Sequence, residues 1–263
     1  MRDRELKLIR SRENPRFRAL RQLATSTRER RKAGLALLDG VHLITAYRAS
    51  GGVPEQLILS ESGAVRAEIG RLATGECAQA PLLFADPLFA DIAQVATPTG
   101  IIALIRTPRA GTLPAVLERC VLLENIQDAG NLGSILRSTA AAGIVTVLLS
   151  PGCAFAWSSK VLRAGMGAHF SLDIFDNVEL IAAASRLQGK LVCASSHARK
   201  SVYQADLRGP LAWIFGNEGS GVSEALSAAA TEQVRIPMAA KTESLNVAAA
   251  AAICLFEQVR QRM

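Results

Sequence analysis

The second half of the chain alternates short apolar segments with segments of helical periodicity, and this alternation restricts the fold more than any other feature. Apolar runs of strand length include CVLLEN (120–125), VTVLLS (145–150), KLVCAS (190–195) and LAWIFGNE (211–218). Segments such as NLGSILRSTAAAG (131–143) lie between them and end at a glycine. Strands that are apolar over their whole length are typical of a parallel sheet with helices on both faces. We therefore predict an α/β fold.

The first half of the chain also has α/β character. We predict strands at residues 35–38 and 56–59, further strands in LLFAD and GIIALIR, and a helix that ends at Gly51-Gly52. The segment TPRAGTLPAVLER contains two prolines and a glycine, which favours a linker. We predict a smaller α/β domain over residues 1–105, a linker over 106–117 and the parallel-sheet domain over 118–263.

Three polar segments of the second half each follow a predicted strand and precede a predicted helix. They are QDAGNLGS, GNEGSG and AAKTESLN. Ligands bind beyond the carboxyl ends of the strands in open parallel sheets, so these segments are expected to converge on a ligand. Ser244 or Asn246 can cap the last helix, whose first turns VAAAAA are rich in alanine, and exposed N–H groups at a helix start can bind a ligand.

Familiar catalytic motifs are missing from the sequence. GNEGSG does not fit GxGxxG, no segment fits GxxxxGK[ST], and neither GxSxG nor HExxH occurs. The cysteines and histidines are scattered and form no CxxC pair, so we expect no disulfide framework and no metal site. They are Cys77, Cys120, Cys153, Cys193, Cys254, His42, His169 and His197.

Positive charge is concentrated at the N-terminus. Residues 1–32 contain twelve Lys or Arg and four Asp or Glu, whereas the whole chain has a formal net charge of +7. A basic arm of this kind suits a phosphate backbone, although a solvated, partly disordered tail is an equal alternative. No apolar run reaches the roughly 20 residues of a membrane span, and the first residues lack the apolar stretch of a signal peptide. We expect a cytoplasmic protein.

The three polar segments, in this order and spacing, resemble the three motifs of the SpoU (TrmH-type) RNA ribose 2′-O-methyltransferases. The motifs are NIQDAGNLGSILRSTAAAG, WIFGNEGSGVSEAL and IPMAAKTESLNVAAAAA, within residues 118–260. The segment SSKVLRAGMGAHF, expected to be helical, also looks like part of this family. The N-terminal segments ENPRFRALRQL and GLALLDGVHLI resemble the family's substrate-binding domain. One departure is Ala129, which stands where the family usually has proline.

The resemblance implies an S-adenosylmethionine-dependent enzyme of the SPOUT fold, with a C-terminal trefoil knot and a homodimeric assembly. It places the catalytic residues at Asn131, Arg137, Glu218, Ser244 and Asn246. It places the cofactor contacts at Gly216, Ile236, Met238 and Leu245. For the basic arm we name Arg16, Arg18 and Arg21 as RNA-binding candidates.

We therefore expect methyl transfer to a ribose 2′-hydroxyl of RNA. Ribosomal RNA is preferred, because the N-terminal domain resembles that of the ribosomal-RNA members. Transfer RNA as substrate, or an RNA-binding protein without catalysis, are the alternatives. Arg137 is either a proton acceptor or a phosphate clamp, since a guanidinium is normally a charged donor. Taken alone, Arg137 could be a surface charge, Asn131, Ser244 and Asn246 could be helix caps, and Glu218 could cap the next helix.

Overall fold

The computed structural model describes residues 6–93, 95–239 and 244–263. The chain separates into two compact units. One runs to Pro108 and includes Trp157–Arg163, and the other contains Arg109–Ala156 and Ala164–Met263. Among the described residues, no helix is both long and apolar enough to cross a membrane.

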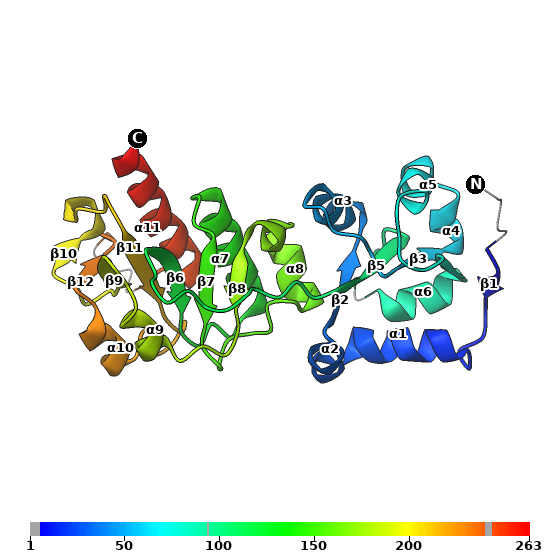
Figure 1. Cartoon of the computed structure of the whole chain (residues 1–263), viewed down its shortest axis with the longest axis horizontal. Helices are drawn as coiled ribbons and strands as arrows, with labels where there is room; N and C mark the ends of the chain where they lie inside the picture. Colours follow the sequence, from blue (N-terminus) through cyan, green and yellow to red (C-terminus); the bar gives the residue numbers. More distant parts are fainter. Residues whose placement is uncertain (1–5, 94, 240–243) are drawn as a thin grey trace. The chain divides into compact units, whose positions relative to one another are not determined.

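The N-terminal unit is built on a mixed five-stranded sheet (Figure 1). Its order is β1-β4-β3-β5-β2, and β5 runs antiparallel to both of its neighbours. The strands are β1 (Leu8–Ile9), β2 (Leu35–Asp39), β3 (Gln56–Ser60), β4 (Leu82–Phe84) and β5 (Ile101–Arg106). The helices are α1 (Pro15–Thr25), α2 (Thr27–Ala33), α3 (Val41–Ala49), α4 (Glu61–Ala64), α5 (Ala67–Ala73) and α6 (Asp86–Ile92). The four predicted strands and the helix before Gly51 are confirmed, whereas β1 was not predicted.

The basic N-terminal segment is a helix of the domain over residues 15–25, so a solvated tail is wrong there. Asn14 caps α1 by accepting the Arg16 N–H at 2.9 Å, and proline occupies the first turn. Phe17 and Leu20 are buried in the core, and the Phe17 ring meets Phe84 edge-on at 5.9 Å. Arg30 is buried and donates to the Ala24 carbonyl at 2.7 Å, which satisfies the end of α1.

The C-terminal unit contains a seven-stranded parallel sheet of order β10-β12-β9-β11-β6-β7-β8. Its strands are β6 (Arg119–Leu123), β7 (Thr146–Leu149), β8 (Asp173–Phe175), β9 (Lys190–Ala194), β10 (Lys200–Ser201), β11 (Leu211–Phe215) and β12 (Glu232–Arg235). The predicted parallel sheet is confirmed. The short strand β10 was not predicted, because two residues carry no periodicity.

Helices cover both faces of this sheet. The remaining helices of the chain are α7 (Ala129–Ala141), α8 (Ser159–Gly165), η1 (Ala168–Ser171), α9 (Leu180–Ala184), η2 (Val202–Gln204), α10 (Glu224–Ala229) and α11 (Val247–Arg262). Leu180 of α9 and Leu226 of α10 pack on the face that carries Leu122 and Ile214. α7 packs against α11, and Trp213 on the other face donates its indole N–H to Gln258 of α11 at 2.9 Å. Trp213 and Gln258 are both buried, so this bond fixes α11 on the sheet.

The segment SSKVLRAGMGAHF does not form the single helix that we expected. α8 ends at Gly165, and η1 begins three residues later. Met166 and Gly167 between them have φ angles of 49° and 87°, which no right-handed helix accommodates.

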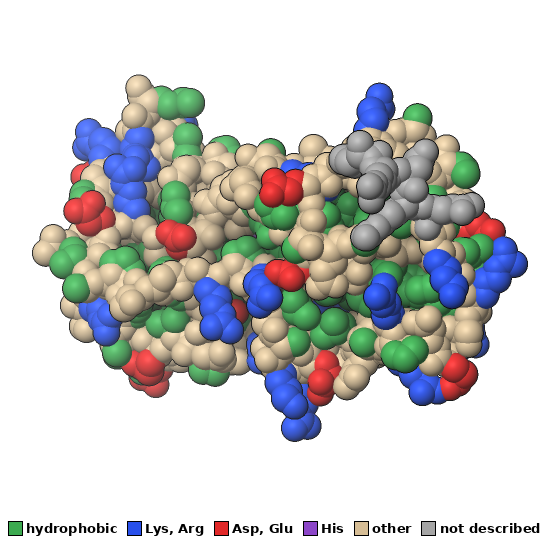
Figure 2. Space-filling view, turned by 45° about the vertical axis from the view of Figure 1, so that its right-hand side comes forward, with side chains coloured by type: hydrophobic (Ala, Val, Ile, Leu, Met, Phe, Trp, Pro, Cys, Tyr) green, Lys and Arg blue, Asp and Glu red, His purple; other side chains and the backbone are tan. Residues whose placement is uncertain are grey.

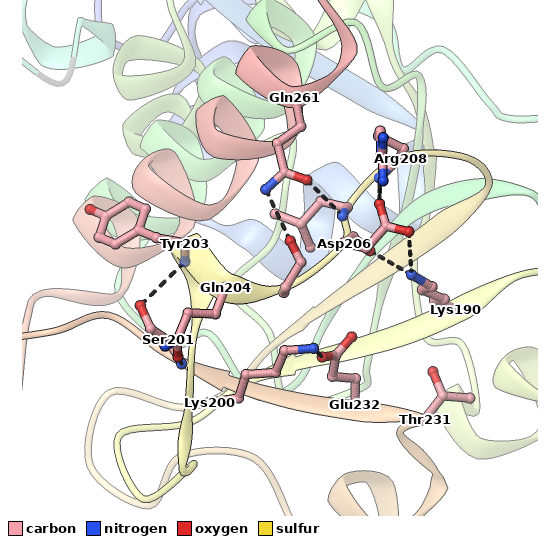
Figure 3. Close-up of polar contacts among 12 residues, drawn as sticks. Lys190, Lys200, Ser201, Tyr203, Gln204, Asp206, Arg208, Thr231, Glu232 and Gln261 are labelled. Carbon is pink, nitrogen blue, oxygen red and sulfur yellow. Dashed lines mark hydrogen bonds and ion pairs between the residues drawn. The ribbon is translucent and has the colours of Figure 1, made fainter.

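The end of α11 holds the segment that follows β10 (Figure 3). Gln261 accepts the Leu207 N–H at 2.9 Å and donates to the Ala205 carbonyl at 3.0 Å. In the same segment, Arg208 donates to Asp206 at 2.8 Å. A side chain of the last helix thus satisfies backbone groups of an irregular segment.

Candidate active site

Three loops meet at the carboxyl ends of the parallel strands. We call residues 124–131, the last three of which begin α7, the first loop, residues 216–223 the second loop, and the described residues 236–239 and 244–246 the third loop. They follow β6, β11 and β12 and lead into α7, α10 and α11, respectively. Because β11 lies beside β6, and β9 alone separates β11 from β12, the loops emerge at one edge of the sheet.

Side chains from all three loops form one hydrogen-bonded chain. Asn246 donates its Nδ2–H to Asn131 Oδ1 at 2.8 Å, and Asn131 donates its own Nδ2–H to Glu218 Oε1 at 2.9 Å. These residues lie 115 and 87 positions apart in the sequence. Three of the five predicted catalytic residues are therefore in direct contact.

Helix capping explains how two of these residues are held. Asp128 caps α7 by accepting the Asn131 N–H at 2.8 Å, so Asn131 is not a cap itself. Asn246 caps α11, because its Oδ1 accepts the N–H groups of Ala248 and Ala249 at 3.0 and 3.3 Å. The amide oxygen of Asn246 therefore caps α11, while its amide nitrogen bonds to Asn131. The cap of α10 is Ser223, so the alternative that Glu218 caps this helix is wrong.

A cavity of about 320 Å³ opens beside this chain. Its lining includes all four predicted cofactor contacts, namely Gly216, Ile236, Met238 and Leu245. Glu218 and Ser244 also line it, and both are exposed. A Cβ atom on Gly216 would lie 2.3 Å from the Gly221 carbonyl carbon, so the second loop closes tightly on itself and only glycine fits.

The loop after β9 also lines the cavity, and the sequence reasoning missed it. Its contributions are Ser195, Ser196 and His197. This segment lacks the glycines that drew attention to the other loops. The signal that could have found it is its position, since it directly follows a buried parallel strand.

Arg137 is exposed on α7, two turns from the start of that helix. It does not line the cavity. Within the described ranges its guanidinium has no ion pair with an acidic side chain. The structure therefore leaves Arg137 available to a ligand without bringing it into the Asn131–Glu218 chain. Lys241 and Glu243 of the segment AAKTESLN lie outside the described residues.

The three RNA-binding candidates are all exposed on α1 of the N-terminal unit. Arg16 borders a second cavity of about 420 Å³ together with Lys7 and Arg10. Arg18 forms an ion pair with Glu13, and Arg21 pairs with no acid among the residues described. Lys and Arg side chains stand singly or in small groups, with Asp and Glu among them, on the face drawn in Figure 2.

The buried titratable groups of the C-terminal unit are unsuited to acid–base or nucleophilic work. Burial raises the pKa of the Cys193 thiol, although this residue lines the cavity, and raises that of Cys254 to about 12. Burial lowers the pKa of His169 to about 4. No cluster of three or more His, Cys, Asp or Glu that could hold a metal ion occurs in the described part of the chain.

Comparison with known proteins identifies the family. Residues 118–256 match the model of the SpoU rRNA methylase family. This chain belongs to that family. Residues 14–103 match a second model, the MRM3-like substrate binding domain. The two matches together cover most of the chain, and the SpoU match contains all three loops.

Three known proteins are similar to this chain over almost their whole length. The 23S rRNA (guanosine(2553)-2′-O)-methyltransferase RlmP of Bacillus subtilis is 29% identical over 95% of this chain and 98% of RlmP. A crystal structure of an RNA 2′-O ribose methyltransferase is 31% identical, with a TM-score of 0.82 over 97% of this chain and 99% of the other. The AdoMet-bound rRNA methyltransferase of Sinorhizobium meliloti is 25% identical, with a TM-score of 0.82 over 98% and 99%.

Proposed function

We propose that this protein transfers a methyl group from S-adenosylmethionine to a ribose 2′-hydroxyl of ribosomal RNA. The observation that carries the proposal is the chain of side chains from Asn246 through Asn131 to Glu218, beside a cavity, in a member of the SpoU family. RlmP, which acts on 23S rRNA, matches both halves of the chain. This supports ribosomal RNA over transfer RNA.

The cavity has the lining that a nucleoside-type cofactor needs. Apolar walls come from Phe215, Ile236, Met238 and Leu245, while polar groups come from Ser195 and the backbone of the second loop. We propose that these residues hold S-adenosylmethionine, whose sulfonium supplies an activated methyl group. The residues of the chain then have two tasks, which are to orient the ribose hydroxyl and to receive its proton.

We assign the orienting task to Asn131 and the proton or phosphate task to Arg137. Asn131 is fixed by two side-chain hydrogen bonds, which leaves its amide little freedom. Arg137 is exposed, and its charged guanidinium can donate two parallel hydrogen bonds to one phosphate group. A proton acceptor and a phosphate clamp remain the two alternatives for Arg137. Ser244 and Glu218 line the cavity and are proposed to contact the reacting groups.

We propose that residues 1–105 bind the RNA substrate and that residues 106–117 connect them to the catalytic domain. The match of residues 14–103 to a substrate-binding domain supports this role. Neutralising Arg16, Arg18 and Arg21 together should weaken RNA binding. It should also flatten the dependence on salt, by roughly 0.7 in log–log slope for each phosphate that the protein no longer neutralises. An unchanged slope, matching that of the control Arg186→Ala, which is exposed in the C-terminal unit, would remove these residues from the interface.

A trefoil knot and a homodimer are further parts of the proposal. In support of the knot, β12 lies between β9 and β10, which are joined by residues 195–199 only. The later strand thus enters between two strands that the chain has already connected. The family resemblance supports a dimer, as does Phe256 of α11, a large apolar side chain that is 47% exposed. A cytoplasmic location stays a prediction.

Methyl transfer by the full-length protein tests the proposal. Calorimetry should detect S-adenosylmethionine binding, and labelled methyl groups should appear on ribosomal RNA and not on transfer RNA. Binding of RNA without any binding of S-adenosylmethionine would favour a non-catalytic RNA-binding protein. Methyl transfer to transfer RNA alone would favour the other alternative. Mapping 2′-O-methyl groups in RNA from cells with and without the gene would then identify the nucleotide.

A further inference from the structure

The far end of the second loop is held by the carboxylate of Glu124, a residue outside the three SpoU motifs quoted above. Glu124, the first residue after β6, accepts the Ser223 N–H at Oε2 and the Ser223 hydroxyl at Oε1, both at 2.7 Å. The two residues lie 99 positions apart. Ser223 ends the second loop, so one side chain ties the exit of the second loop to the entrance of the first.

The near end of the second loop is fastened to the neighbouring residue, Asn125. Asn217 donates its Nδ2–H to the Asn125 carbonyl at 2.9 Å. The φ angle of Asn125 is 55°, a left-handed conformation that asparagine tolerates better than most residues. Asn217 Oδ1 also accepts the N–H groups of Gly219 and Ser220 at 2.9 and 3.1 Å. The loop is therefore held at both ends and braced from within.

Glu218 lies between these two fastenings. Its carboxylate reaches Asn131, and the same short stretch from Gly216 to Val222 lines the cavity. Capping of α10 alone does not require Glu124, because the Ser223 hydroxyl already accepts the Leu226 N–H at 3.4 Å. The placement of Glu124 fits a different task, which is to fix the position of the loop relative to β6.

We infer that Glu124 is a positioning residue for methyl transfer. It holds the second loop in the conformation in which Glu218 bonds to Asn131 and the loop forms one wall of the cofactor cavity. Without its carboxylate, the exit of the second loop is released, while the Asn217 contact with Asn125 and the Glu218 contact with Asn131 remain. Both cofactor binding and the transfer step then suffer, although Glu124 neither lines the cofactor cavity itself nor bonds to a member of the Asn131 chain.

Variants of the full-length protein test the inference through cofactor affinity and the rate at saturating substrates. Glu124→Ala should weaken S-adenosylmethionine binding and lower kcat by about tenfold each, because the charge-assisted hydrogen bonds to Ser223 are removed. Glu124→Gln keeps the shape but can accept only one of the two bonds, so its effect should be intermediate. The exposed acid Glu118 provides the control, and Glu118→Ala should change neither quantity.

A double-mutant cycle and hydrogen exchange separate positioning from general stability. If the bond to Ser223 is the route, the losses in Glu124→Ala/Ser223→Ala should be smaller than the sum of the losses in the two single variants, because either change breaks the same bond and Ser223→Ala adds only the loss of the α10 cap. The amides of Gly219 and Ser220 should exchange at least about tenfold faster in Glu124→Ala, with core amides unchanged. Affinity and kcat within twofold of wild type, or additive effects in the cycle, would overturn the inference.

The inference rests on the proposed function for its ligand, but the two can fail separately. A wild-type protein that neither binds S-adenosylmethionine nor transfers methyl groups would refute the proposed function. An active wild type with an equally active Glu124→Ala variant would refute the positioning role alone. The exchange rates test the fastening of the second loop in either case.

Discussion

Asn131→Asp is the sharpest perturbation of the candidate site, because it changes the chemistry of one atom and almost no volume. Asn131 Oδ1 accepts from Asn246, and an aspartate can still do so. Asn131 Nδ2 donates to Glu218 at 2.9 Å, and a carboxylate oxygen there faces another carboxylate. The variant thus exchanges one hydrogen bond for a repulsion and leaves the rest of the chain in place.

The magnitude follows from that distance. Two unit charges separated by 2.9 Å repel by about 1.4 kcal/mol in water and by about 6 kcal/mol at an effective dielectric constant of 20. Glu218 is exposed, so solvent screening brings the value close to the lower limit. The missing hydrogen bond to a charged group adds about 1.5 kcal/mol or more. The sum of about 3 kcal/mol corresponds to roughly a hundredfold slower methyl transfer at pH 8.

The pH dependence has a definite sign. A neighbouring negative charge raises the pKa of the introduced carboxyl group, so it binds a proton at a higher pH than an isolated aspartate does. Once protonated, it donates a hydrogen bond to Glu218, as the amide did. The rate of Asn131→Asp relative to wild type should therefore rise as the pH falls from 8 towards 5. Single-turnover transfer of labelled methyl groups, measured for both proteins at each pH, gives this ratio.

Asn131→Ala is the matched control, because it removes both hydrogen bonds and introduces no charge. Its rate relative to wild type should be low and independent of pH. If Asn131→Asp transfers methyl groups at the wild-type rate at pH 8, the contact with Glu218 does not matter to the reaction. If its ratio is as flat with pH as that of Asn131→Ala, the repulsion between two carboxylates is not the cause of its defect.

Changes at four further positions test other parts of the structure. Arg137→Ala and Arg137→Lys should lose most single-turnover transfer but keep cofactor affinity, whereas Arg186→Lys, exposed elsewhere, should not. Ala129→Pro, at the first position of α7, should raise the free energy of unfolding by about 0.4–1 kcal/mol in a urea titration. Asn246→Asp keeps the oxygen that caps α11 but not the Nδ2 donor, so the melting temperature should hold while transfer falls. Burial lowers the pKa of His169 from 6.5 to about 4, so the unfolded state binds a proton at a higher pH than the folded state does. The contribution of His169 to the free energy of unfolding is therefore present above pH 6.5 and is lost as the pH falls below this value. Between pH 7 and 5, wild type should lose about 2 kcal/mol more than His169→Gln.

Much of the catalytic unit could be predicted because its signals are local. Strands such as β6 and β11 are apolar throughout, and each is followed by a polar segment, so the rule for parallel sheets places the loops at one edge. The cavity lining by Gly216 and Leu245 agrees with the family motifs. The insertion of β12 between β9 and β10 could not be predicted, because hydrophobic periodicity gives the type of an element and not its neighbours.

The basic N-terminal segment contains a helix whose apolar residues could have been recognised from their spacing. Phe17, Leu20 and Ala24 follow helical spacing and are buried together, yet the count of basic residues left a solvated tail as an equal alternative. Arg30 is one of the basic residues counted in this segment, but it is buried against the end of α1. Charge counts describe side chains and not the backbone, so a basic segment can be a structural helix when its apolar residues share one face.

The contacts that build the site share a physical origin with those that build the fold. Asn246 begins α11 with its oxygen and reaches Asn131 with its nitrogen, so the start of the helix and the site geometry are fixed by one side chain. Because α11 also packs on α7, which begins at Ala129, the two asparagines can meet only when both helices are seated on the sheet. Ala248 and Ala251 near the start of α11 are buried, and side chains as small as alanine let two helices pack closely. A site made in this way cannot form in the unfolded chain or in either helix alone. It exists only as a consequence of the packing between α7 and α11.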